Sequence, residues 1–139
     1  MNEHFEVRIA VERDFDQIHM ADLSIKPEIL RTKIGRNEVI VCDESGHITG
    51  VLRFQWFWDY LPFINYIWVE EGFRDEHRAS RMIEKLEATT EGRNYKRIMA
   101  STQSNETAQN FFRKVGFQYA GGFAMSDQPF ELIMIKYLN

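Results

Sequence analysis

Hydrophobic and polar positions alternate along the chain with two different periods, and the two periods separate strands from helices. Residues 5–10 alternate with a period of two, which predicts a half-buried strand. Residues 39–42 and 48–58 predict two more strands, joined by turn-forming residues at 43–46. Residues 63–69 are almost entirely apolar on both faces, as in a central strand that is covered on both sides.

The helical period of 3.6 residues appears in the first third of the chain and again after the central strand. Asp14, followed three residues later by Gln17, predicts a capping box and a first helix. Pro27 suits the first turn of a second helix, which Gly35 would end. Residues 79–90 carry an apolar stripe that predicts a longer third helix.

The second half of the chain adds a crossover and a closing hairpin. A strand at 95–101 after the third helix predicts a parallel strand pair. Asn105 is expected to cap a fourth helix that Gly116 ends. Strands at 117–123 and 130–137 follow, the first with a glycine pair that indicates a bulge or a bend. The order predicts an α+β fold with a mostly antiparallel mixed sheet of about seven strands, four helices and one parallel strand-helix-strand crossover.

Composition narrows the class of protein. The 139 residues, 44% of them hydrophobic and 27% charged, predict a single domain over 1–139. A net charge of −4 argues against a nucleic-acid partner. The longest apolar run, 63–69, is too short for a membrane span, and the N-terminus lacks a signal-peptide pattern. With Cys42 as the one cysteine, we expect a cytoplasmic protein, and the spacing of the four histidines predicts no metal site.

Candidate chemistry gathers where the central strand leaves the sheet and enters the third helix. A helix N-terminus attracts phosphate through its free N–H groups and its dipole. Arg74, Arg78 and Arg81 add three cations close by, and Ser80 adds a hydroxyl. The alternative is a solvated helix start with ordinary surface arginines.

Two segments resemble the signatures of the GNAT superfamily of N-acyltransferases. In residues 74–79, Arg74, His77 and Ala79 occupy the signature positions of an acyl-CoA loop, Arg/Gln-x-x-Gly-x-Gly/Ala. Residues 105–117 resemble the second signature, which begins with Asn and ends with Gly-Phe. The resemblance extends over nearly the whole chain and implies an N-acetyltransferase that uses acetyl-CoA as co-substrate.

The resemblance also implies a set of binding residues. Backbone groups at the end of the central strand would pair with the pantetheine arm, amides of the following loop would hold the pyrophosphate, and the fourth helix would face the thiol. The implied residues are Ile67, Trp68, Val69, Arg74, Asp75, Glu76, His77, Arg78, Ala79, Ser80, Asn105, Ala108 and Phe112.

Two of these residues depart from the family pattern. His77 replaces a glycine whose lack of a side chain lets the backbone approach the pyrophosphate. Phe112 replaces the tyrosine that commonly protonates the departing thiolate, and a phenyl ring donates nothing. Tyr119, Ser104 or a water could substitute as the acid. The departures also leave open a second function, a degenerate acyl-CoA-binding or regulatory module without turnover.

Amine acylation needs a base, because most of an amine with a pKa near 10 is protonated at neutral pH. Glu70 and Glu71, at the end of the central strand, are the candidate carboxylates, and surface charge is the alternative.

The aromatic cluster at 56–63 is either hairpin packing or a wall of the acceptor pocket, with Asp59 attracting a cation. The expected acceptor is a primary amine of a small molecule or a peptide, and a homodimer is possible.

Overall fold

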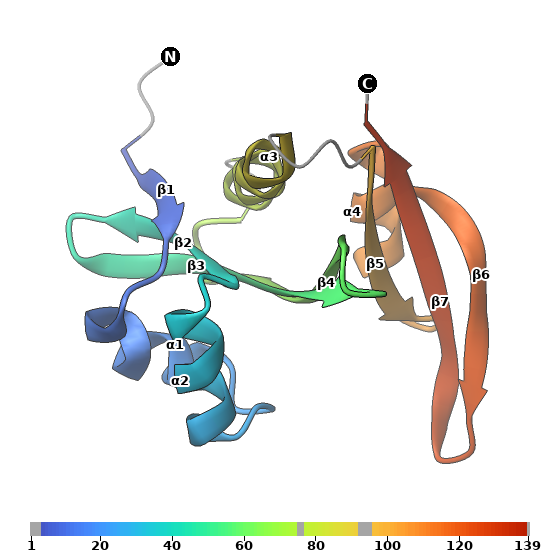
Figure 1. Ribbon diagram of the computed structural model, residues 1–139, viewed down its shortest axis with the longest axis horizontal. Coiled ribbons are helices and arrows are strands. Elements are labelled where there is room, and N and C mark those ends of the chain that lie inside the picture. Colours follow the sequence, from blue (N-terminus) through green and yellow to red (C-terminus); the bar gives the residue numbers. More distant parts are fainter. Residues whose placement is uncertain (1–3, 75–76, 92–95, 139) are drawn as a thin grey trace. The chain divides into compact units, whose positions relative to one another are not determined.

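The computed structural model describes residues 4–74, 77–91 and 96–138, and these residues form seven strands and four α-helices (Figure 1). The strands form one sheet in the order β1-β2-β3-β4-β5-β7-β6. The strands are β1 (Glu6–Ile9), β2 (Val39–Glu44), β3 (His47–Phe57), β4 (Leu61–Val69), β5 (Arg97–Gln103), β6 (Gln118–Met125) and β7 (Gln128–Tyr137). The helices are α1 (Phe15–Ala21), α2 (Pro27–Gly35), α3 (Arg78–Glu91) and α4 (Ala108–Lys114), with a short 3-10 helix η1 (Glu12–Asp14) before α1.

Strand directions confirm the predicted α+β fold. β4 runs parallel to β5, with Phe63 opposite Met99 and Ile64 opposite Ala100. The pairs β1·β2, β2·β3, β5·β7 and β6·β7 are antiparallel. The crossover through α3 therefore supplies the parallel pair that the strand-helix-strand pattern predicts.

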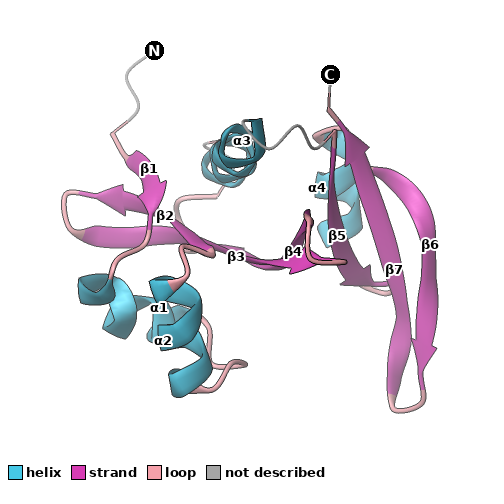
Figure 2. Ribbon diagram, in the orientation of Figure 1, coloured by secondary structure: helices cyan, strands magenta, loops and turns pink. Residues whose placement is uncertain are grey.

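The chain divides into two compact units, residues 1–54 with 66–89 and residues 55–65 with 90–139, and each is described by itself. In the first unit α1 and α2 pack on one face of β2 and β3 around buried residues such as Ile18, Leu30 and Val51 (Figure 2). Helix α3 covers the other face. A Cβ at Gly50 would lie 3.1 Å from the terminal methyl of Met82 and 3.3 Å from the Cys42 side chain, so the glycine leaves room for α3 to pack closely on β3.

In the second unit, β5, β7 and β6 form an antiparallel arrangement that is joined to the first half of β4 through β5. Leu61, Phe63 and Met99 form its buried cluster. All eight residues of the edge strand β6 are exposed. The β6·β7 register shifts between Tyr119 and Gly121, which confirms the predicted bulge, and Gly121 has a φ of 116° there.

Two capping predictions are wrong. Asp14 does precede α1, but its carboxylate accepts hydrogen bonds from the Arg8 guanidinium and the Val11 N–H, and Gln17 bonds to Gly46 and Ile48 instead. Asn105 does not cap α4, which begins only at Ala108 after Thr107. Asp14 thus caps η1 and not α1, since its side chain accepts the N–H of the η1 N-cap residue Val11, and a longer loop separates Asn105 from α4.

The predicted end of the third helix at Gly92 and the start of the next strand at Tyr95 lie outside the described residues. Among the residues that are described, no helix is both long and apolar enough to cross a bilayer.

Candidate active site

The candidate residues fall into two groups, one on each unit. The first group contains the end of β4, the residues that follow it and the start of α3. The second group contains the end of β5, helix α4 and the start of β6.

At the end of β4, Ile67, Trp68 and Val69 are half-buried. Trp68 packs against the cluster beneath α1 and α2. The Nε of Arg74 donates a 2.9 Å hydrogen bond to the Val69 carbonyl, so the chain folds back on the strand end within five residues. The structure therefore brings together two of the implied residues, Val69 and Arg74, by a direct bond.

The start of α3 is fixed by the carbonyl of His77. It accepts hydrogen bonds from the Arg81 N–H at 2.9 Å and the Ser80 Oγ at 3.0 Å. The backbone of His77 has a φ of 68°, in the left-handed region that glycine adopts most readily. Ala79 is half-buried behind it. The expected roles of Asp75 and Glu76 lie outside the described residues.

Arg78 does not present its guanidinium to solvent, because the residue is only 3% exposed. Its Nη2 pairs with Glu44 at 3.4 Å, its Nε donates to Thr49, and its Nη1 donates to the Phe73 carbonyl. Of the three arginines that the sequence suggested as phosphate cations, Arg78 thus contributes its charge to the interior. Its helical backbone position is the part that stays a candidate for binding.

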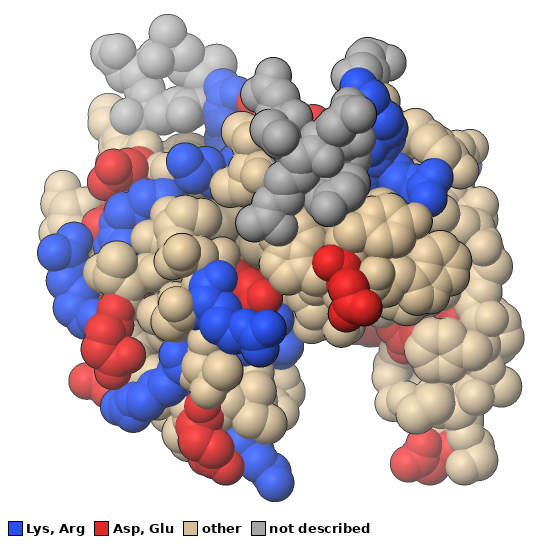
Figure 3. All heavy atoms as spheres, viewed as in Figure 1, with Lys and Arg blue, Asp and Glu red and all other residues tan. Residues whose placement is uncertain are grey.

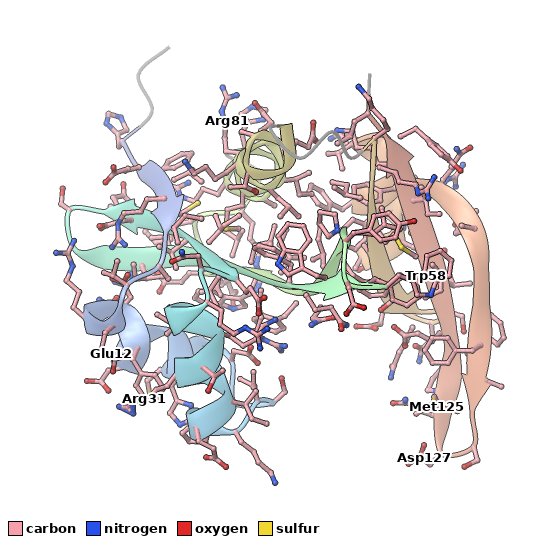
Figure 4. The ribbon with its side chains drawn as sticks, viewed as in Figure 1. Glu12, Arg31, Trp58, Arg81, Met125 and Asp127 are labelled. Atoms are coloured by element: carbon pink, nitrogen blue, oxygen red, sulfur yellow. The ribbon has the colours of Figure 1, made fainter. Side chains whose placement is uncertain are left out.

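Arg74 and Arg81 keep charged groups at the surface of this segment. Arg74 is exposed. Arg81 projects from the first turn of α3, where Figure 4 labels it, and it pairs with Glu84 at 3.0 Å. This pair is exposed on both sides, so it is weak and open to competition from an anionic ligand.

Glu70, the candidate base, has a partner that sequence spacing did not reveal. Both of its carboxylate oxygens lie 3.0–3.1 Å from the Nε2 of His47, at the start of β3. The Glu70 N–H donates to the Thr49 carbonyl at 2.9 Å, which continues the strand contact beyond β4. His47 lies 23 residues before Glu70, so chain order alone does not connect the two residues. Only the β3–β4 register brings the two side chains together.

A buried polar group lies near the end of α1. Tyr66 on β4 donates its hydroxyl to the Ala21 carbonyl at 2.6 Å. Burial, and secondarily the charge of Asp22, raises the pKa of Tyr66 above its usual value. The Asp22 carboxylate is fully buried and pairs with Arg53 at 2.9 Å. Tyr66 is therefore held neutral, with its proton already donated to a backbone acceptor.

In the second unit, Asn105 is exposed in the loop before α4 and Ala108 begins the helix. Phe112 is only 2% exposed, and its ring meets Phe117 edge-on at 5.1 Å. A hydroxyl added to this ring would therefore enter a closely packed environment.

Tyr119 on β6 is 49% exposed and donates its hydroxyl to the Gln109 Oε1 at 2.7 Å. The amide of Gln109 donates in turn to the carbonyls of Ser104 and Glu106. Arg113 lies over the Tyr119 ring, 5.5 Å from its centroid. The sequence did not indicate a role for Gln109, although it directly follows Ala108 on the helix that carries the second signature.

The aromatic residues between β3 and β4 were expected either to pack within the hairpin or to form a wall of the acceptor pocket, and they differ in burial. Phe57 packs with Phe63 at the edge of the buried cluster, as hairpin packing requires. Trp58 is 67% exposed and, like Asp59, has a positive φ in the tight turn. This turn precedes β4, whereas the implied phosphate loop follows it, so the two features belong to opposite ends of the strand.

Charged side chains are unevenly distributed over the visible surface. In Figure 3, positive and negative groups alternate over the first unit, while the face over β5, β7 and β6 is largely uncharged. In Figure 4, Met125 and Asp127 lie at the tip of the β6–β7 hairpin. No group of three or more His, Cys, Asp or Glu residues that could hold a metal ion occurs within the described part of the chain.

Comparison with known proteins gives the family. The sequence pattern of the acetyltransferase (GNAT) family matches residues 8–117. No curated protein matches the chain.

Solved structures of low sequence identity share the fold. Ard1 from Thermoplasma volcanium superposes with a TM-score of 0.84 at 15% identity over 99% of each chain. The ribosomal-protein-S18-alanine N-acetyltransferase from Escherichia coli gives 0.77 at 14% identity, over 97% of this chain and 94% of that one. PaiA N-acetyltransferase from Thermoplasma acidophilum, in complex with coenzyme A, gives 0.78 at 11% identity, over 97% and 99%. Since the match extends over residues 8–117, which include both the β4–α3 connection and the second signature segment, the chain belongs to the acetyltransferase (GNAT) family.

Proposed function

We propose that this protein is an N-acetyltransferase that transfers an acetyl group from acetyl-CoA to a primary amine of a small molecule or a peptide. The observation that carries the proposal is the backbone at His77. Its left-handed φ of 68° is the conformation that a glycine of the acyl-CoA signature adopts at no steric cost. The segment keeps a glycine-like backbone although a histidine occupies the position.

The CoA groups are assigned to described residues as follows. The backbone of Ile67, Trp68 and Val69 pairs with the pantetheine arm. The N–H groups at the start of α3 bind the pyrophosphate, where the helix dipole favours negative charge. Arg74 and Arg81 supply the exposed cations, and Ser80 contributes at its backbone because its hydroxyl already bonds to His77. Asn105, Ala108 and the α4 surface face the thiol end.

The reaction forms a C–N bond between the amine and the acetyl carbonyl carbon and breaks the C–S bond of the thioester. The amine loses one proton to a base, and the departing thiolate of CoA takes up one proton. Glu70 is the proposed base, with His47 holding its carboxylate, and Tyr119 is the proposed acid. A thiol pKa of about 8.5 makes thiolate a tolerable leaving group, so the acid is helpful rather than essential.

Amine acceptors fit the fold relatives by their names. One of them acetylates an alanine of a ribosomal protein, which is a peptide amine. The excess of acidic residues, 21 against 17 basic, favours a cationic acceptor over an anionic one. A cytoplasmic location and a homodimer complete the proposal.

The second candidate function is a non-catalytic acyl-CoA-binding module. It is favoured by Phe112, which is buried and has no proton to donate. Release of free thiol from acetyl-CoA, measured with a panel of small-molecule amines and short peptides, separates the two functions. Turnover with any amine supports the transferase. Tight CoA binding without thiol release from the whole panel supports the binding module and contradicts the transferase.

A further inference from the structure

The buried side chain of Arg78 contacts both the segment after β4 and the strands β2 and β3 of the first unit. We propose that the Arg78 side chain has a positioning role: its guanidinium holds the backbone at the end of β4 and the start of α3 in the conformation that binds the acyl-CoA phosphates, without itself touching them. This inference rests on the proposed function, and it reverses the expectation that Arg78 is a phosphate ligand.

Three polar contacts connect the guanidinium to three different elements. Its Nη1 donates to the Phe73 carbonyl, in the segment after β4, at 3.2 Å. Its Nε donates to the Thr49 Oγ1 on β3 at 3.2 Å, and its Nη2 lies 3.4 Å from the Glu44 carboxylate on β2. Because a guanidinium is planar and rigid, these contacts fix the Phe73 carbonyl relative to two strands.

Aromatic rings enclose the same charge. The guanidinium carbon lies 4.8 Å from the ring centroid of Phe73 and 4.5 Å from that of Phe5. Such contacts are strongest where water is excluded, and Arg78 is 3% exposed. The Phe73 side chain and the Phe73 carbonyl therefore both contact the same guanidinium, and the ring also lies beside His47.

Thr49 extends this connection to the beginning of the segment. Its carbonyl accepts the Glu70 N–H at 2.9 Å, and its hydroxyl accepts from Arg78. The segment is thus attached to β3 at both Glu70 and Phe73. A loop held at two points keeps its N–H groups oriented before the ligand arrives, which lowers the cost of ordering them on binding.

A positioning role and a phosphate-contact role predict different salt dependence. An exposed cation that touches a phosphate loses part of its contribution as salt screens the charge. A buried cation that acts through the backbone is screened much less. The two roles therefore differ in the slope of CoA affinity against ionic strength.

The test compares Arg78→Met with Arg74→Ala and Arg81→Ala, the exposed cations of the same segment. CoA dissociation constants are measured by calorimetry from about 50 to 500 mM salt. For Arg78→Met we expect a dissociation constant raised about tenfold, the equivalent of one charged hydrogen bond, with the wild-type salt slope retained. The KM for acetyl-CoA rises while kcat at saturation stays close to the wild-type value. For the two controls we expect a smaller slope.

Two more variants keep the test decisive if Arg78→Met fails to fold. Thr49→Val removes the Nε acceptor but keeps the carbonyl that holds Glu70, and Glu44→Gln removes the negative charge that lies 3.4 Å from Nη2. Each should weaken CoA binding in the same direction as Arg78→Met, and the Thr49 and Glu44 effects should be non-additive, because both act through one guanidinium.

Amide hydrogen exchange without CoA tests the positioning independently of the proposed function. Faster exchange in peptides covering 66–74 and 77–84 of the Thr49→Val protein is the expected result. A reduced salt slope in Arg78→Met, unchanged affinity in all three variants, or unchanged exchange in these peptides would overturn the inference. Absence of CoA binding by the wild-type protein would instead overturn the proposed function, while the exchange comparison would still decide whether Arg78 and Thr49 hold the segment.

Discussion

His77 has a left-handed backbone that lowers stability, and in the proposed CoA site its side chain would also limit the approach of the pyrophosphate. A residue with a Cβ destabilises the folded state by about 1–2 kcal/mol when its backbone is left-handed and not right-handed, whereas glycine does not. Glycine loses about 0.5–1 kcal/mol through the greater freedom of the unfolded chain. We therefore expect His77→Gly to raise the free energy of unfolding by about 0.5 kcal/mol and to tighten CoA binding about threefold or more, because the side chain no longer limits the approach of the pyrophosphate. Chemical denaturation and calorimetry check the two effects.

Ser45→Gly provides the matched control for this prediction. Ser45 also has a positive φ, of 53°, but lies in the exposed turn between β2 and β3. Its replacement should change stability by a similar amount and leave CoA affinity unchanged. Weaker CoA binding by His77→Gly would show that the imidazole itself binds phosphate.

The missing hydroxyl at Phe112 defines a second prediction at this scale. If Tyr119 protonates the thiolate, Tyr119→Phe should lower kcat about 10²-fold, a typical contribution of general acid catalysis. Phe112→Tyr in that background should restore part of kcat, at a stability cost of about 1–2 kcal/mol for a hydroxyl placed in a site that is 2% exposed. Steady-state kinetics with the best acceptor measures both changes.

Tyr137→Phe is the control, since Tyr137 is another exposed tyrosine of the second unit, at the end of β7. It should leave kcat unchanged. A wild-type rate for Tyr119→Phe would assign proton delivery to water and leave the Tyr119–Gln109 hydrogen bond a structural role only.

At the scale of elements, an ionic group joins β1, η1 and β2. The Arg8 guanidinium bonds to Asp14 at 2.7 Å and to Asp43 at 2.9 Å, and Asp14 also accepts the Val11 N–H. The bond from Arg8 holds the pKa of Asp14 below its usual value, and the backbone bond from Gly46 does the same for the pKa of Asp43. Both carboxylates are therefore more acidic in the folded protein than in the unfolded chain.

This difference predicts acid destabilisation in a defined range of pH. A carboxyl group with a lowered folded pKa stabilises the protein fully above its unfolded pKa of about 3.9, and the contribution is lost as pH falls through the folded pKa. We expect the free energy of unfolding to decrease steeply below about pH 4. Asp14→Asn should cost about 2 kcal/mol at pH 7 and flatten this decrease, because one of the two carboxylates is gone. Urea unfolding from pH 7 to pH 2 measures the profile.

Asp16→Asn, at an exposed aspartate of the same helix turn, is the control for this profile. It should change the unfolding free energy little at any pH. An unchanged acid profile in Asp14→Asn would mean that other carboxylates dominate acid unfolding.

Element types were predictable because each carries a local signal. Alternation identified β1, and Pro27 and Gly35 marked the two ends of α2 as the structure has them. Helix caps were not predictable, since Asp14 has Arg8 as a competing partner six residues away. A sequence pattern shows which groups can cap a helix, but not which of several partners the folded chain brings nearest.

Signatures and chain order predicted where the candidate site residues lie along the chain, but not which partners their side chains contact. The signatures located the β4–α3 connection, but a signature does not show that Arg78 points inward to Glu44 and Thr49. The His47–Glu70 contact depends on strand register, which the sequence of a single chain does not fix for long strands.

At the scale of the whole molecule, the net charge of the chain and its local cations should have opposite effects on the affinity for an anionic ligand. The chain carries a net charge of −4, which repels an anionic ligand at long range, while the proposed phosphate contacts of Arg74 and Arg81 would attract it locally. Salt screens the long-range repulsion within about 10 Å at 0.1 M, so the local contacts decide the affinity, which we expect to be micromolar.

CoA at about 100 times its dissociation constant should then stabilise the folded protein by about 2.7 kcal/mol, which for a chain of this size raises Tm by about 10 °C. Thermal unfolding with and without CoA measures the shift. Pantetheine, which lacks the phosphates, should give a much smaller one, and a Tm unchanged by millimolar CoA would contradict both the transferase and the binding module, because each requires the folded state to bind CoA.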